Sequence, residues 1–363
     1  MSSSARIVRM PLVSPRWVRQ EAAKRDKRIV MVDATWYLPN SPFASPDGRT
    51  ANEHFLATTE QSGSSFLQRH SVFLDLDECA DRRSTLPHMM PAVEDFETHV
   101  TDTLHIDNHS VVVCYDRHGI FSAPRAWFMF RHFGHQEVFV LDGGLPAWDA
   151  DEANGRGPQD GDNPRDADNH FEVSRSGSSK VEVYSVAKNN RSSTTSSSTT
   201  KPQQNQSTDE FYGVVDLSFM QDNVGSSSTT GTPPKCPIID ARPAGRFTGE
   251  VPEPRAGMRS GHMPGAANIP FGTLLTADKK MLPPAELQKV FQTAGVDPLA
   301  PFVATCGSGM TAAIVLLAAE VLRATEQSSG SAASTSSLLL YDGSWTEYGN
   351  ASKKDAVEVV TGP

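Results

Sequence analysis

The stretch Thr305-Cys306-Gly307-Ser308-Gly309-Met310-Thr311-Ala312-Ala313 lies between an apolar run at residues 302–304 and an Ala/Leu-rich segment at residues 314–322. This order predicts a buried strand, a tight turn and then a helix. The glycines let backbone N–H groups point inward, and such a turn before a helix forms an anion-binding loop. The same N–H groups stabilise a thiolate over a thiol. The stretch therefore predicts a reactive Cys306, although a buried structural thiol in a glycine-rich turn fits these residues equally well.

The rest of the chain repeats the order of this stretch. In the first half, short apolar runs at residues 29–34, 72–77, 110–115 and 138–142 alternate with helix-like segments. In the second half, residues 238–242, 302–313 and 339–345 echo residues 31–35, 111–123 and 140–144, each about 200 residues later. Strands that alternate with helices form parallel sheets. We therefore expect an α/β fold of two tandem copies of one domain, each a mainly parallel sheet flanked by helices.

The two copies differ at the central turn. The first copy places Asp116-Arg117-His118 where the second has Cys306. This asymmetry favours a chemical role for Cys306, because a residue needed only for packing would be expected in both copies.

Between the copies the apolar signal almost disappears. Residues 151–169 are rich in Gly, Asp and Asn, and residues 189–207 are mostly Ser, Thr, Gln and Asn. Such sequences bury too little apolar surface to offset the entropy of ordering them. We expect domains at residues 1–150 and 211–363, joined by a linker with a low-complexity insertion at residues 151–210 that contains short ordered segments at 171–173 and 181–184.

Composition excludes several classes of function. The chain of 363 residues has a formal net charge of −10 and no basic stripe, so a nucleic acid or an anionic membrane is not expected as a partner. No apolar run approaches the ~20 residues of a membrane span. The four cysteines show no C-x-x-C spacing, which favours a reducing compartment. Residues 1–20 contain arginines but no Asp or Glu, as mitochondrial targeting segments do. We nevertheless expect a cytoplasmic protein, with a mitochondrial location as the alternative.

Motifs throughout both halves match one known family. In the first half they are FLDLD at 73–77, PHM at 87–89, FSAPR at 121–125 and LDGGLPAW at 141–148. In the second half they are DARPAGRF at 240–247, PEPR at 252–255, SGHMPGAANIPF at 260–271, CGSGMTA at 306–312 and DGSW at 342–345. Through these motifs the chain resembles the two-domain rhodanese superfamily, and most closely the 3-mercaptopyruvate sulfurtransferases.

The resemblance implies two tandem rhodanese-like domains and an enzyme without a cofactor. Its substrate would be 3-mercaptopyruvate, and its sulfur would pass through a persulfide on Cys306 to a thiol acceptor such as thioredoxin or glutathione. Loop residues would cradle that persulfide: Gly307, Gly309, Met310 and Thr311. Arg246 and Arg255 would hold the carboxylate and keto oxygen of the substrate in a cleft between the domains. Asp77, His88 and Ser308 would form a proton relay, with Asp77 and His88 contributed by the domain that lacks the nucleophile.

The residues themselves support these roles unequally. A bidentate arginine suits a planar carboxylate, and Arg246 is expected in a loop beyond the carboxyl end of a strand, where α/β sites form. Arg255, by contrast, could be a surface charge. Ser308 could be a turn residue, His88 a surface histidine and Asp77 a loop acid. His262 is expected to support the fold.

Metal binding and three other functions are alternatives to the mercaptopyruvate sulfurtransferase that the resemblance implies. No metal is expected, because His105 and His109 lack partners with metal-ligand spacing. A thiosulfate:cyanide sulfurtransferase of the same fold is the first alternative, although such enzymes usually carry a basic residue after the cysteine. A phosphatase of related fold would need an arginine at the end of the loop, where this chain has Ala312. A non-catalytic binding module is the alternative from a different class.

Overall fold

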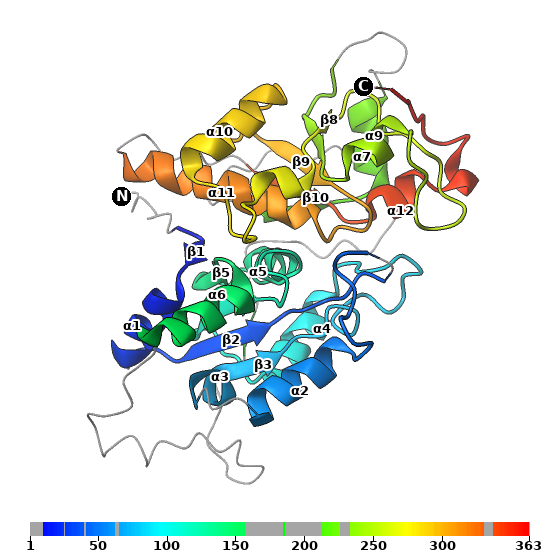
Figure 1. Cartoon of the computed structure of the whole chain (residues 1–363). Coiled ribbons are helices and arrows are strands. Elements are labelled where there is room, and N and C mark those ends of the chain that lie inside the picture. The colour runs from blue at the N-terminus through cyan, green and yellow to red at the C-terminus, as the bar shows by residue number, and fades with distance from the viewer. Residues whose placement is uncertain are drawn as a thin grey trace, which may run out of the picture.

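The computed structural model describes residues 10–24, 26–39, 41–61, 65–156, 184–185, 212–225, 233–329 and 337–362. Within these residues the chain forms two parallel five-stranded sheets, each with helices packed against it (Figure 1). The predicted fold class is therefore confirmed. The predicted domain boundaries stay a prediction. Of the segments predicted to be ordered within the linker, 171–173 and 181–183 lie outside the described residues, and Tyr184 is buried against Phe96 and His135.

The first sheet has the strand order β1-β5-β4-β2-β3, and all its pairings are parallel. Its strands are β1 (Leu12–Val13), β2 (Ile29–Asp33), β3 (Ser71–Phe73), β4 (Val111–Tyr115) and β5 (Val138–Leu141). Its helices are α1 (Pro15–Lys24), α2 (Ala51–Gln61), α3 (Ser65–His70), α4 (Val93–Thr98), the π-helix η1 (His99–Thr103), α5 (Ala123–His132), α6 (Gly144–Asp151) and the π-helix η2 (Glu152–Arg156). Every residue of β2 and β4 is buried, as expected for continuous apolar runs covered on both faces.

The second sheet has the strand order β6-β10-β9-β7-β8, again with only parallel pairings. Its strands are β6 (Tyr212–Val215), β7 (Ile238–Asp240), β8 (Ala267–Asn268), β9 (Phe302–Thr305) and β10 (Leu338–Tyr341). Its helices are α7 (Leu217–Val224), α9 (Ala244–Thr248), the 3-10 helix η4 (Phe271–Leu274), α10 (Pro284–Thr293), α11 (Ala312–Ser328), α12 (Ser344–Tyr348) and the 3-10 helix η5 (Ala351–Lys353). Taken strand by strand, the order repeats that of the first sheet, as a tandem duplication requires.

The two domains meet through the helices that follow their central strands. Helix α5 follows β4, helix α11 follows β9, and the two helices contact each other between the sheets (Figure 1). Both helices are buried almost throughout, and one hydrophobic cluster includes residues of both domains. The loops between β4 and α5 and between β9 and α11 therefore open at the boundary between the domains.

Two searches of the described residues bear on function. None of the described helices combines the length and the apolar character that crossing a membrane requires. The described part of the chain also contains no cluster of three or more His, Cys, Asp or Glu side chains placed to hold a metal ion.

Candidate active site

The Cys306 loop, residues 306–311, leaves the carboxyl end of β9 and enters α11 at Ala312. Cys306 is buried, and the amino-terminal N–H groups of α11 follow directly, so the loop has the composition and position of an anion-binding turn. Gly309 has a φ of +76°, and a β-carbon there would lie 3.1 Å from Arg125 Nη1 and 3.2 Å from the Asp342 carbonyl oxygen. A side chain at this position would be strained by the backbone conformation and would crowd both of these neighbours.

The turn after β10 fixes the backbone of the Cys306 loop. The Trp345 and Thr346 N–H groups donate to the carbonyl oxygens of Cys306 and Gly307, each at 2.9 Å. The Cys306 N–H donates to Ser344 Oγ at 3.3 Å. Ser344 itself has a φ of +50°, a conformation that is unusual outside glycine. The predicted motif at residues 342–345 therefore has a direct contact with the Cys306 loop.

The proposed relay residues lie in one hydrogen-bonded chain across the domain boundary. His88 Nδ1 lies 3.0 Å from Ser308 Oγ, and His88 Nε2 lies 3.1 Å from Asp77 Oδ1. His88 and Ser308 are buried, whereas Asp77 is exposed. The hydrogen bond from His88 lowers the pKa of Asp77 below its ordinary value. Asp77 and Ser308 are 231 positions apart in the sequence. The packing of the two domains brings them together with His88.

Trp36 is a further member of this chain that the sequence did not single out. Its indole Nε1–H donates to Asp77 Oδ2 at 3.0 Å, and its ring packs edge-on against the His88 ring at 4.8 Å. The carboxylate therefore has donors on both oxygens, and the histidine ring has an aromatic wall.

Arg246 lies on the short helix α9, so the prediction that it lies in a loop is wrong. The helix forms because Pro243 accepts hydrogen bonds from the next turn and Gly249, with a φ of +85°, ends it. The guanidinium lies next to the Cys306 loop, because a β-carbon on Gly307 would be 3.5 Å from Arg246 Nη2. Glu253 holds this group through Nε, at 3.0 Å, and through Nη2.

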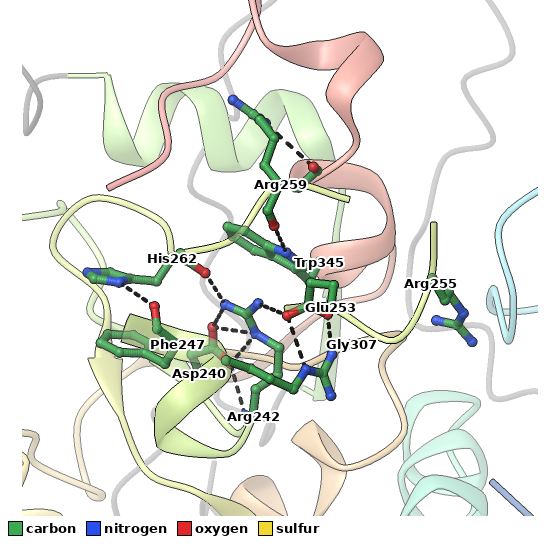
Figure 2. Close-up of polar contacts among 12 residues, drawn as sticks. Asp240, Arg242, Phe247, Glu253, Arg255, Arg259, His262, Gly307 and Trp345 are labelled. Atoms are coloured by element: carbon green, nitrogen blue, oxygen red, sulfur yellow. Dashed lines mark hydrogen bonds and ion pairs between the residues drawn. The ribbon is translucent and has the colours of Figure 1, made fainter. Parts of the chain in front are cut away.

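Glu253 is held in turn by the buried residue Arg242. Arg242 Nη1 donates to Glu253 Oε1 at 2.8 Å, and Arg242 Nε donates to Asp240 at the end of β7. The Arg242 guanidinium also stacks over the Trp345 ring, 3.9 Å from its centroid. Figure 2 shows Glu253 beside the Arg242 guanidinium and on the side of Gly307. The sequence contained Glu253 in the PEPR motif but gave it no role, because its two arginine partners are fixed by the fold.

Arg255 occupies a different position from Arg246. Its side chain is exposed, and Nη1 donates to Thr346 Oγ1 at 2.8 Å. Figure 2 shows it apart from the cluster of Arg242 and Glu253. Partial burial lowers the pKa of Arg255, and the electrostatic influence of Cys306 opposes that shift, so Arg255 belongs to the electrostatic surroundings of the loop.

His262 has the contacts of a structural residue. Its Nδ1 lies 2.9 Å from the Phe247 carbonyl oxygen, and its ring stacks on the Phe247 ring at 3.7 Å (Figure 2). Burial lowers its pKa. These contacts fit the prediction that it supports the fold.

The Asp116 loop, residues 116–121, is the counterpart of the Cys306 loop in the first domain. The Asp116 carboxylate accepts hydrogen bonds from the N–H groups of His118, Phe121, Ser122 and Ala123, all at 2.9 Å. Burial raises the pKa of Asp116, and the amide hydrogen bonds oppose that shift. A fixed carboxylate therefore fills the anion-binding turn of this domain.

Comparison with known proteins agrees with this architecture. The model of the rhodanese-like domain matches residues 71–151 and 226–351. A thiosulfate/3-mercaptopyruvate sulfurtransferase of Arabidopsis thaliana, described as mitochondrial, is 33% identical over 93% of this chain and 76% of its own length. The 3-mercaptopyruvate sulfurtransferase of Rattus norvegicus is 32% identical over 93% of this chain and 91% of its own length.

A solved structure gives the same result. The crystal structure of SseA, a 3-mercaptopyruvate sulfurtransferase from Escherichia coli described as having the rhodanese fold, is similar with a TM-score of 0.60 and 28% identity. The similarity covers 93% of this chain and all of that chain. The chain therefore belongs to the rhodanese family, as a two-domain sulfurtransferase.

Proposed function

We propose that this chain transfers the sulfur of 3-mercaptopyruvate to a thiol acceptor through a persulfide on Cys306. The observation that carries the proposal is the hydrogen-bonded chain from Asp77 through His88 to Ser308, which ends two residues from the buried cysteine. A thiol substrate carries a proton that must leave its sulfur during transfer, and this chain offers a route for it.

The first half-reaction breaks one carbon–sulfur bond and forms one sulfur–sulfur bond. The Cys306 thiolate attacks the substrate sulfur while the electron pair of the carbon–sulfur bond passes to the departing carbon as an enolate. The thiol proton leaves through Ser308 and reaches that enolate, which becomes pyruvate. With Asp77 accepting the Nε2 proton of His88, the Nδ1 atom is free to accept from the Ser308 hydroxyl. Cys306 then carries the persulfide anion.

The arginines meet the charge of the substrate. Glu253 orients Arg246 through Nε and Nη2, and Nη2 also lies beside Gly307. The Nη1 group, for which the described residues provide no hydrogen-bond partner, would meet the substrate carboxylate. Arg255 would approach the keto oxygen, where negative charge develops in the enolate. The Cys306 loop itself has no Lys or Arg, so the positive charge comes from these two neighbouring segments.

The second half-reaction returns Cys306 to its thiolate. An acceptor thiol attacks the outer sulfur of the persulfide, the sulfur–sulfur bond to Cys306 breaks, and the acceptor leaves as a persulfide. Thioredoxin or glutathione would serve as acceptor, and cyanide would replace them in an assay. No step calls for a cofactor.

Thiosulfate is the competing donor, because the Arabidopsis relative is named for both donors. Thiosulfate has no thiol proton, so it would leave the relay without a task. The intact relay therefore favours 3-mercaptopyruvate. It also disfavours a non-catalytic binding module, which would need neither Cys306 nor its polar neighbours.

The test is a comparison of kcat/KM for the two donors with cyanide as the acceptor in both assays. We expect 3-mercaptopyruvate to be preferred by about tenfold or more, a ratio that reports differential transition-state binding. A preference for thiosulfate would overturn the choice of donor while leaving the family unchanged.

The cytoplasmic localisation of the protein stays a prediction. The mitochondrial description of the Arabidopsis relative supports the alternative, and residues 1–9 lie outside the described part of the chain. Fractionation of cells that express the untagged chain would decide between the two.

A further inference from the structure

A buried ion pair joins the two domains directly behind the Cys306 loop. Arg125, in the first turn of α5, places Nη1 2.8 Å from Oδ1 of Asp342, which follows β10. Both side chains are 2% exposed. A buried ion pair is costly to desolvate and contributes little to stability compared with apolar residues of the same size. Its presence at this boundary therefore calls for a reason other than stability.

The same two side chains hold the backbone that directly follows the relay histidine. Arg125 Nη2 donates to the His88 carbonyl oxygen, and the Met90 N–H donates to Asp342 Oδ2. His88 has a φ of +60°, in the left-handed region that non-glycine residues rarely adopt. Such a conformation persists only where the surroundings enforce it. The ion pair supplies that enforcement through two hydrogen bonds just after the His88 Cα atom, at the His88 carbonyl oxygen and at the Met90 N–H.

The ion pair also touches the loop that receives the histidine. The backbone of Gly309 lies against it, so closely that a β-carbon there would be 3.1 Å from Arg125 Nη1 and 3.3 Å from Asp342 Oδ1. One charged pair thus contacts the segment that carries His88 and the loop that carries Ser308.

The duplicated domain provides an internal control. Lys279 takes the place of His88, with the same φ of +60°, and the Met281 N–H donates to Asp142 as the Met90 N–H donates to Asp342. Counted from the first residue of each helix, the position on α11 that matches Arg125 is the buried apolar residue Ile314. Of the two matching junctions, only the one behind the Cys306 loop therefore has an arginine at this position.

We propose that the Arg125–Asp342 pair is a positioning device that sets His88 against Ser308 for proton transfer; this inference rests on the proposed function. Arg125 touches neither the reacting sulfur nor the Cys306 side chain in any contact that the structure describes, so it acts through His88. Losing it should slow the step in which the substrate thiol gives up its proton, and should leave the Cys306 thiolate and its attack on an aprotic donor nearly unchanged.

The test uses the full chain with both members of the pair replaced by apolar residues, Arg125→Met with Asp342→Leu, so that no charge is left buried alone. We expect kcat for 3-mercaptopyruvate to fall about 30-fold with KM changed less than about threefold. We expect the rate of Cys306 alkylation by iodoacetamide and the rate with thiosulfate to change less than about threefold. Arg125→Lys keeps the charge but cannot donate to both partners, and it should show the same pattern if the double variant fails to fold.

A second readout does not depend on the donor. Diethyl pyrocarbonate should modify His88 faster in the variants than in the wild type, measured by peptide mass spectrometry, because the ring is buried while the pair holds its segment. Unchanged kcat and unchanged His88 reactivity in a folded variant would overturn the inference. Equal losses with both donors would also overturn it, because they would show a general role in domain contact. If the wild type itself fails to use 3-mercaptopyruvate, the proposed function fails, and the His88 reactivity still decides whether the pair positions the histidine.

Discussion

The Asp116 loop and the Cys306 loop occupy the same place in two copies of one domain, but only the first holds a carboxylate of its own in the turn. In the first loop the Asp116 carboxylate accepts four backbone hydrogen bonds, so the turn is already filled. In the second loop a cysteine replaces the aspartate, and among the described residues no side-chain carboxylate accepts a hydrogen bond from a backbone N–H group of residues 307–312. The fold thus supplies two turns of the same kind, and a carboxylate fills the first of them.

The segments that approach the two loops differ in the same sense. In each domain, one residue with a left-handed backbone conformation contacts the loop of the other domain. His88 contacts the Cys306 loop, and Lys279 contacts the Asp116 loop. A histidine can accept and donate a proton near neutral pH, whereas a lysine there meets a turn that holds a carboxylate. The two copies therefore share this geometry and differ in the residues that occupy it.

The largest expected effect comes from removing the nucleophile. Cys306→Ser keeps the size and polarity of the side chain but loses the thiolate, so we expect sulfur transfer from either donor to fall by at least about 10⁴-fold. Cys236→Ser, at a half-buried cysteine outside the loops, should retain the wild-type rate. Sulfur transfer by Cys306→Ser at more than a few per cent of the wild-type rate would show that the activity belongs elsewhere.

The next effect concerns the filled loop. Asp116→Ala leaves three buried N–H groups and one partly buried N–H group without an acceptor, so we expect the free energy of unfolding to fall by about 3 kcal/mol. Urea denaturation measures it, and added sulfate should recover part of the loss by entering the emptied turn. Asp102→Ala, at an exposed aspartate of the same domain, should change it by less than about 0.5 kcal/mol. An unchanged midpoint for Asp116→Ala would show that the carboxylate does not hold the loop.

The arginine beside the Cys306 loop gives the third test. Glu253→Gln removes the carboxylate that orients Arg246, so kcat/KM for 3-mercaptopyruvate should fall about 20-fold, mainly through KM. The matched control is Glu250→Gln, at an exposed glutamate of the same segment, which should behave like the wild type. A change confined to kcat would instead place Glu253 in the chemical step.

The smallest effect is expected at the exposed end of the relay. Asp77→Asn weakens the orientation of His88, so kcat for 3-mercaptopyruvate should fall about tenfold while the thiosulfate rate stays unchanged. Because His88 lowers the pKa of Asp77 below its ordinary value of 3.8, any stability that the carboxylate contributes is present at neutral pH and is lost as the pH falls through that lowered pKa. Thermal denaturation of the wild type and Asp77→Asn should therefore differ at pH 6 and converge well below pH 3.8. A difference that persists in acid would exclude this origin.

Most of the fold and part of the site could be predicted from local patterns in the sequence. The apolar runs that became β2, β4, β7, β9 and β10 are continuous, and the glycine-rich turn before α11 is a local signal, so both could be predicted from the chain. The partners of Glu253, and the ion pair of Arg125 with Asp342, depend on how distant segments pack. No spacing along the sequence encodes such contacts. The role of the Asp116 carboxylate was also hidden, because it follows from the conformation of its own turn.

The central claim is that only the Cys306 loop carries sulfur. The most direct measurement is mass spectrometry of the intact chain, followed by peptide mapping, after 3-mercaptopyruvate is added without an acceptor. The account predicts one additional sulfur atom per chain, located on the Cys306 peptide, and its loss when cyanide or a thiol is added. Release of pyruvate with Cys306 unmodified, or sulfur on a cysteine of the first domain, would contradict it.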